Sequence, residues 1–219
     1  MNFRIFHPRR SGGHAVIFWL LRSSGSYAFY NSLPLVSSTP KLPREKTPGA
    51  ANNLFWSHED PNREKSLASC VSLFGVSWLP RPDHDVFILR DFYNYAASKL
   101  RAGEKRGERF SASWRDCDSQ AWLGFANYYA QRPKQFIVYN QWLCDKDYRD
   151  EVAERYGFKA APYDDSVSDY GGGSSFSGTR EPANSDALLK RYVGMEEAIL
   201  SLCSPEIAST NKSIFGWSL

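Results

Sequence analysis

The amino-acid sequence predicts an α/β fold, with a central and mostly parallel β-sheet flanked by helices. Short apolar runs typical of buried strands alternate along the chain with longer segments of helical periodicity. This alternation is the pattern of consecutive βαβ units, which build parallel sheets. The length of 219 residues is sufficient for one domain with a substantial core, and the hydrophobic fraction of 42% is ordinary for a globular protein.

Each element follows from its local pattern. Buried strands are predicted at 3–6, 53–57, 85–90 and 135–140. Helices are predicted at 12–23, 91–103, 116–131, 145–157 and 185–202. Residues 31–53 hold four prolines and residues 164–186 are rich in Asp, Ser and Gly, so both are expected to be irregular. We expect one domain over residues 1–205, followed by a loose C-terminal tail at 206–219.

Charge and cysteine content narrow the possible partners. The net charge of +3 is too small to indicate nucleic-acid binding, although it suits a small anionic ligand. The four cysteines are widely spaced without a CxxC pair, which predicts no metal site and reduced thiols, with a disulfide left open. The apolar run at 15–21 is too short to cross a bilayer. We therefore expect a cytoplasmic protein that does not bind a membrane and retains its N-terminus.

A polar turn between the first strand and the first helix predicts an anion-binding loop. The segment HPRRSGGH, residues 7–14, places Arg9, Arg10, Ser11, Gly12, Gly13 and His14 at this turn. Glycines let backbone N–H groups approach an anion closely, and the helix N-terminus adds a positive dipole. The segment lacks the lysine of a Walker A loop, which argues against an ATPase or GTPase. The alternative is a tight strand–helix turn that binds nothing.

A second motif, ILRDFYNYAAS at 88–98, follows a later strand. Arg90 stands at the carboxyl end of that strand, and Ser98 lies eight residues further on, two turns into the next helix. Both side chains are able to bind one phosphate if the helix passes beside the ligand. The alternative is an Arg–Asp pair that caps the helix, with Ser98 exposed.

Together these two motifs resemble those of the sulfotransferases that use 3′-phosphoadenosine 5′-phosphosulfate (PAPS). The resemblance implies a single P-loop-like domain, a loop at 9–14 that binds the 5′-phosphosulfate, and Arg90 and Ser98 on the 3′-phosphate, with PAP as product and no metal. Arg10 stands where the family has a lysine, and Gly13 and His14 replace a pair of threonines. The segment 136–158 is similar to a family strand–turn–helix, with Asn140 and Gln141 replacing an acidic pair.

The remaining family features are matched less closely. The loop DYGGGSSFSGTR, 169–180, stands in for a basic glycine loop, so Ser174, Ser175 and Arg180 are expected near the 3′-phosphate or in a surface linker. A general base is expected after the strand at 53–57, either His58 or Glu59, unless this is a plain polar turn.

The acceptor is an unidentified hydroxyl or amine, on a small molecule or a glycan. Two alternatives to a sulfotransferase remain, a P-loop nucleotide kinase or hydrolase, and a non-catalytic module that binds PAP or another nucleotide. The sequence does not indicate the oligomeric state.

Overall fold

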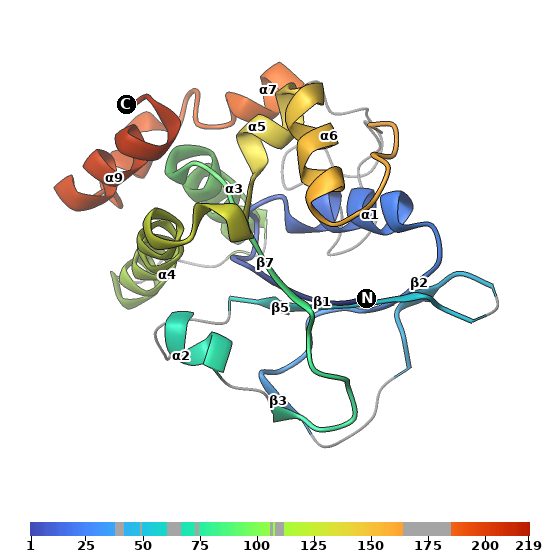
Figure 1. The fold of residues 1–219 in the computed structure, drawn as a ribbon. Coiled ribbons are helices and arrows are strands. Elements are labelled where there is room, and N and C mark those ends of the chain that lie inside the picture. The colour runs from blue at the N-terminus through green and yellow to red at the C-terminus, as the bar shows by residue number, and fades with distance from the viewer. Residues whose placement is uncertain are drawn as a thin grey trace.

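The fold is described from a computed structural model of the chain, shown in Figure 1. The structure describes residues 1–37, 42–48, 50–60, 67–72, 75–105, 107, 112–163 and 185–219. Among these residues, no helix is long and apolar enough to cross a membrane.

A six-stranded sheet forms the centre of the molecule, in the order β4-β2-β5-β1-β7-β8. Its strands are β1 (Asn2–His7), β2 (Tyr27–Tyr30), β4 (Glu45–Lys46), β5 (Asn53–Glu59), β7 (His84–Leu89) and β8 (Phe136–Val138). Every pairing in this sheet is parallel except that of β4 with β2. The predicted α/β fold class is therefore confirmed. A separate two-stranded sheet pairs β3 (Val36–Ser37) with β6 (Gly75–Val76).

Helices cover both faces of the sheet (Figure 1). They are α1 (Gly13–Ser24), α2 (Leu67–Ser72), α3 (Phe92–Lys105), α4 (Ala112–Gln131), α5 (Tyr139–Cys144), α6 (Lys146–Arg155), α7 (Ser185–Leu189), α8 (Glu196–Leu200) and α9 (Pro205–Phe215). Alternate residues of the strands point to opposite faces. Phe3 and Ile5 therefore pack with α1, α5 and α6, whereas Phe6 and Phe87 pack with α3, α4 and α9.

The chain beyond residue 184 differs from the prediction. The expected helix at 185–202 is divided into α7 and α8, and Gly194 lies between them with a φ of 80°. The expected loose tail instead forms helix α9, which the Ser204 side chain caps. Asn211 on this helix is fully buried, accepts a hydrogen bond from the backbone N–H of Phe92 and donates to the carbonyl of Trp217. The tail is therefore a packed part of the domain.

Two other elements differ from the prediction near the site. Strand β2 was not predicted, since a four-residue YAFY run beside a proline-rich segment gives little periodic signal. Strand β8 ends at Val138, so Tyr139, expected inside a strand, is the first residue of α5. This early end places the Tyr139 ring against the loop that follows β1.

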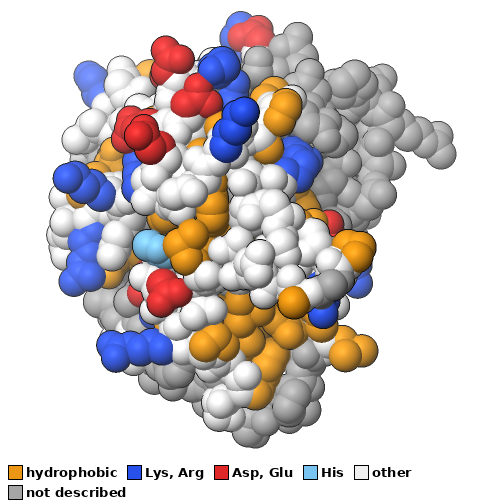
Figure 2. Space-filling model, turned by 45° about the vertical axis from the view of Figure 1, so that its right-hand side comes forward, with side chains coloured by type: hydrophobic (Ala, Val, Ile, Leu, Met, Phe, Trp, Pro, Cys, Tyr) orange, Lys and Arg blue, Asp and Glu red, His pale blue; other side chains and the backbone are white. Residues whose placement is uncertain are grey.

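Surface charge is mixed on the face shown in Figure 2, where basic and acidic side chains are interspersed and hydrophobic side chains gather in the lower part of the view.

Candidate anion-binding site

The candidate site lies where the carboxyl ends of the central strands meet. Strand β1 lies between β5 and β7. After β1 the chain passes through α1 to β2 on one side, and after β7 it leads towards β8 on the other. Adjacent strand ends from which the chain leaves in opposite directions form the crevice in which open α/β sheets bind ligands.

The loop after β1 has the backbone of an anion-binding turn. Arg10 and Gly12 have φ angles of 75° and 80°, and Gly12 directly precedes α1. No side chain of a described residue caps this helix, and the N–H groups of its first turn point out of its N-terminus towards the loop. The Ser11 side chain is 1% exposed, and its hydroxyl has no hydrogen-bond partner among the described residues. An unsatisfied buried hydroxyl at a helix N-terminus is the expected state of a donor awaiting a ligand.

Both glycines of the loop are required by close packing. A Cβ atom at Gly12 would overlap the Tyr139 ring, and one at Gly13 would overlap the imidazole of His7. Glycine is therefore required at both positions by space, and at Gly12 by its left-handed backbone as well.

Arg90 carries a buried charge that has no acidic partner among the described residues. Its side chain is almost completely buried, and its Nη1 donates to Ser98 Oγ at 3.3 Å. Its Nη2 donates to the carbonyl of Leu188 at 2.5 Å, and its guanidinium lies 4.9 Å from the centre of the Tyr139 ring. Arg90 forms no ion pair within the described part of the chain, and its Nε has no partner there. Burying an uncompensated cation is costly, so the geometry favours an anionic ligand.

A second arginine donates a hydrogen bond to the same serine. Arg191 Nη1 donates to Ser98 Oγ at 3.3 Å, from a position 93 residues further along the chain. Burial, together with the neighbouring charges of Arg90 and Arg10, lowers the pKa of Arg191 to about 10. Arg90 and Arg191 are thus brought together at Ser98, with Arg10 near enough to act on Arg191 electrostatically, and an anion would relieve the repulsion between these charges. Sequence reasoning did not identify Arg191.

A buried polar network holds the arginines in place. Asp91 caps α3 by accepting from the backbone N–H of Asn94 at 2.9 Å. Asn94 donates to the carbonyl of Leu189 at 2.7 Å and accepts from the backbone N–H of Arg191 at 2.9 Å. Asn140 donates to the Asp91 carboxylate at 2.8 Å and accepts from the backbone N–H of Asp91. A carboxylate at position 140 would repel Asp91, which accounts for an amide at this position.

The two predicted bases lie on opposite faces of the sheet. In the register of β1 with β5, His58 pairs with Phe6 and Glu59 pairs with His7. His58 stacks on Phe6 at 5.2 Å, is 3% exposed and donates from Nδ1 to the Leu33 carbonyl. Burial lowers its pKa to about 4. His58 is therefore part of the core on the face of the sheet opposite α1, away from the loop.

Glu59 lies on the other face of the sheet, beside the loop that follows β1. Its Oε2 is 3.4 Å from Arg9 Nε and accepts from Ser32 Oγ at 3.3 Å. The neighbouring His7 is buried beneath Gly13, and burial lowers its pKa to about 4. Of the two candidate bases, only Glu59 is beside the loop.

Two other loop residues predicted to bind the donor have protein partners. The Arg9 side chain is half exposed and turned towards Glu59, while its backbone N–H donates to Asp60 at 2.6 Å. His14 Nε2 donates to Asn31 Oδ1 at 3.0 Å, towards the end of β2. The predicted Ser174, Ser175 and Arg180 lie outside the described residues.

A buried lysine that the sequence analysis missed braces the loop. Lys99 Nζ is 3.4 Å from Asp60 Oδ2 and 3.1 Å from Asp118 Oδ1, and all three side chains are 6% exposed. Because Asp60 also accepts from the N–H of Arg9, this ion-pair network joins α3 and α4 to the loop. Within the described ranges, no group of three or more His, Cys, Asp or Glu side chains is arranged to hold a metal ion.

When the chain is compared with known proteins, similar folds are found among solved structures. No protein-family model and no curated protein matches the chain. The mouse sulfotransferase SULT7A1 complexed with PAP is similar at a TM-score of 0.45 and 11% identity, over 74% of this chain. A sulfotransferase from Alicyclobacillus acidocaldarius is similar at a TM-score of 0.43 and 8% identity, over 100% of this chain and 96% of that one. Both are sulfotransferases.

The chain spans 60% of the length of the mouse enzyme. Both TM-scores are below 0.5 and both identities are low, so these likenesses do not indicate a function for this chain.

Proposed function

We propose that this protein is a sulfotransferase that moves a sulfuryl group from PAPS to a hydroxyl or amine acceptor. The observation that carries the proposal is the buried Arg90, which has only uncharged partners among the described residues and shares Ser98 with Arg191. Two guanidinium groups and a hydroxyl around one point suit a dianionic phosphate, because arginine binds phosphate oxygens in a fork geometry.

Two anion sites at neighbouring strand ends support a donor with two phosphate-bearing positions. The loop at residues 8–13 follows β1, and Arg90 follows the adjacent β7. In this proposal the 3′-phosphate binds to Arg90, Ser98 and Arg191, and the 5′-phosphosulfate binds to the loop N–H groups and Ser11. The left-handed Arg10 lies close enough to Arg191 for its charge to help lower the pKa of the Arg191 side chain.

The proposed transfer is a direct displacement at sulfur. Glu59 takes the proton of the acceptor hydroxyl or amine, and the acceptor atom bonds to sulfur as the bond from sulfur to the 5′-phosphate oxygen breaks. PAP leaves with the electron pair on that oxygen. Arg10 and the N-terminus of α1 stabilise the added negative charge, and Arg10 does so without donating a proton because it stays ionised.

A cavity of about 410 Å³ at the end of β2 gives room for an acceptor. Its lining includes Tyr30 and Asn31 at the end of β2, and Asn31 accepts hydrogen bonds from His14 and from Ser57. The cavity is therefore linked to the donor loop through one side chain. The remaining lining residues are Leu33, Leu42, Pro43 and Arg44.

The test of this function is transfer itself. PAPS labelled with sulfur-35 would be incubated with the protein and panels of phenols, alcohols, amines and glycans, with EDTA present throughout. We expect label to move to at least one acceptor class, and Arg90→Ala to abolish the transfer. Binding of PAP without transfer to any acceptor would favour a non-catalytic module, and phosphoryl transfer from ATP that EDTA stops would favour a kinase.

A further inference from the structure

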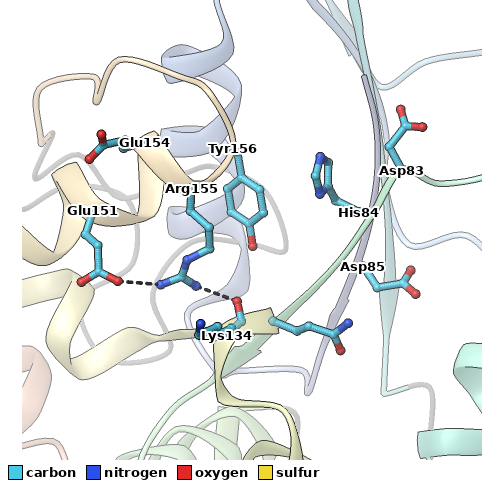
Figure 3. Close-up of a pocket in the computed structure, with 9 residues that line it drawn as sticks. Asp83, His84, Asp85, Lys134, Glu151, Glu154, Arg155 and Tyr156 are labelled. Atoms are coloured by element: carbon cyan, nitrogen blue, oxygen red, sulfur yellow. Dashed lines mark hydrogen bonds and ion pairs between the residues drawn. The ribbon is translucent and has the colours of Figure 1, made fainter.

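Two cavities lie at opposite ends of the central sheet. The cavity drawn in Figure 3, of about 540 Å³, is at the amino ends of β7 and β8, where Arg155 pairs with Glu151 and donates to the carbonyl of Lys134. Strand β7 has six residues, so about 20 Å of strand separates this cavity from the crevice. The cavity of about 410 Å³ is at the carboxyl end of β2, the same end of the sheet as the loop after β1. An acceptor that reaches the sulfur of the donor therefore binds in the cavity beside β2.

Asn31, which lines this second cavity, has an amide oxygen that is occupied by two donors. His14 Nε2 donates to Asn31 Oδ1 at 3.0 Å, and Ser57 Oγ donates to the same oxygen at 3.1 Å. Ser57 Oγ also accepts from the backbone N–H of Ser32 at 3.0 Å, which leaves its one proton for Asn31. The polar group that remains on the amide is Nδ2, a donor. This nitrogen has no hydrogen-bond partner among the described residues.

The same asparagine lies between the proposed base and the donor loop. Ser57 and Glu59 are two residues apart on β5, so their side chains share one face of the sheet and lie about 7 Å apart along the strand. Ser32, next to Asn31 in the chain, has a φ of 51° and donates from Oγ to Glu59 Oε2 at 3.3 Å. On the other side, His14 belongs to the first turn of α1. An acceptor atom held between Glu59 and the loop is therefore within reach of the Asn31 amide.

A hydroxyl and an amine differ in what they offer to this N–H donor. A hydroxyl oxygen has two lone pairs, so one attacks sulfur while the other accepts from Asn31 Nδ2, and the hydroxyl proton passes to Glu59. A neutral amine has one lone pair, and the new bond to sulfur uses it. An ammonium ion has none, and the described residues that line the cavity include no carboxylate that would attract its charge. An amine therefore leaves the Asn31 donor without a partner during transfer, which costs free energy.

We propose that Asn31 is a specificity-determining residue that selects a hydroxyl over an amine as the acceptor of the sulfuryl group. This inference rests on the proposed sulfotransferase function and narrows the acceptor to an alcohol or a phenol. The hydroxyl oxygen bonds to sulfur, its proton goes to Glu59, and the bond from sulfur to the 5′-phosphate oxygen breaks with its electron pair on PAP. Tyr30, which packs edge-to-face on Trp78 at 5.1 Å, and the buried Leu33 give the cavity an apolar wall for the body of such a compound.

The experiment compares transfer from labelled PAPS to para-cresol and to para-toluidine, which share one carbon skeleton and are both uncharged near neutral pH. We expect kcat/KM for the phenol to exceed that for the amine at least about tenfold in the wild type. Asn31→Asp keeps an oxygen for His14 and Ser57 but replaces the N–H donor with an acceptor, so it is expected to lower the phenol-to-amine ratio about tenfold. Asn127→Asp, on the exposed surface of α4, makes the same charge change and is expected to leave the ratio unchanged. If the wider panel gives a better hydroxyl acceptor, that compound and its amino counterpart form the pair.

The ratio of the two acceptors isolates Asn31, because a change in donor binding or in the base alters both rates alike. A wild type that favours the amine, or an equal ratio in wild type and Asn31→Asp, would overturn this inference and leave the sulfotransferase proposal standing. Absence of label on every compound of the panel would overturn both. A thermal melt shows whether the new carboxylate disturbs the fold, and the wild-type ratio decides the question by itself if it does.

Discussion

Arg90 and Arg191 donate to the same oxygen, Ser98 Oγ, each at 3.3 Å. Two guanidinium groups that converge on an uncharged hydroxyl repel one another, and burial together with this repulsion lowers the pKa of Arg191. An anion between them would remove the repulsion and give a partner to the Arg90 Nε, which has none in the described part of the chain. This pair is therefore the strongest structural argument for a phosphate at this place.

The first prediction concerns recognition of the 3′-phosphate. Arg191→Ala is expected to weaken PAP binding roughly ten- to a hundredfold, since a charge-assisted hydrogen bond contributes about 1.5–3 kcal/mol. Binding of AMP, which lacks the 3′-phosphate, is expected to change little. Arg101→Ala, on the exposed surface of α3, is the control and is expected to alter neither affinity. An equal loss for PAP and AMP would contradict this role of Arg191.

The second prediction distinguishes two costs of adding a Cβ atom at Gly12, which are steric overlap with the Tyr139 ring and backbone strain. Gly12 and Gly216 both have a left-handed backbone, with φ angles of 80° and 81°, but an added Cβ meets the Tyr139 ring at Gly12 and has open space at Gly216. Gly216→Ala is expected to cost about 1–2 kcal/mol of unfolding free energy from its left-handed backbone alone. Gly12→Ala is expected to cost clearly more and to weaken PAP binding. Urea denaturation measures both, and equal losses would show that Tyr139 does not restrict the loop.

The third prediction assigns the base. Glu59→Gln is expected to lower kcat for sulfuryl transfer about 10²- to 10⁴-fold while PAP affinity is nearly unchanged. His58→Asn keeps a donor for the Leu33 carbonyl and is expected to retain most of the activity. The comparison requires the acceptor found in the transfer assay. Loss of activity in His58→Asn with a normal thermal melt would reverse the assignment.

Sequence patterns predicted some residues of this site and missed others, and the difference has physical reasons. The spacing of Arg90 and Ser98 is local, so the sequence was enough to predict both for one phosphate site, and the structure adds their direct contact. The choice between His58 and Glu59 depends on which face of β5 meets α1, and that is set by the register with β1. Arg191 reaches Ser98 only because the chain turns after α7, whereas the periodic pattern there predicted an unbroken helix.

The fourth prediction concerns acid stability. Burial lowers the pKa of both His7 and His58 from 6.5 to about 4. Because the folded protein binds these protons more weakly than the unfolded chain does, stability is expected to fall as the pH drops below about 6.5. Each histidine contributes a loss approaching 1.4 kcal/mol per pH unit and reaching about 3 kcal/mol near pH 4.

This pH dependence is measured by urea unfolding at a series of pH values between about 7 and 4. His58→Asn has no imidazole to titrate, so its stability is expected to fall less steeply than that of the wild type. Parallel curves for the two proteins would mean that His58 titrates normally and is not buried as described.

The most direct test of the central claim is a calorimetric titration of the wild-type protein with PAP, AMP and ATP plus Mg²⁺. A buried arginine pair that awaits a 3′-phosphate predicts that PAP binds at least tenfold more tightly than AMP, and that this preference is lost in Arg90→Ala. It also predicts that Mg²⁺ has no effect on PAP binding. Tighter binding of ATP–Mg²⁺ than of PAP would contradict the account.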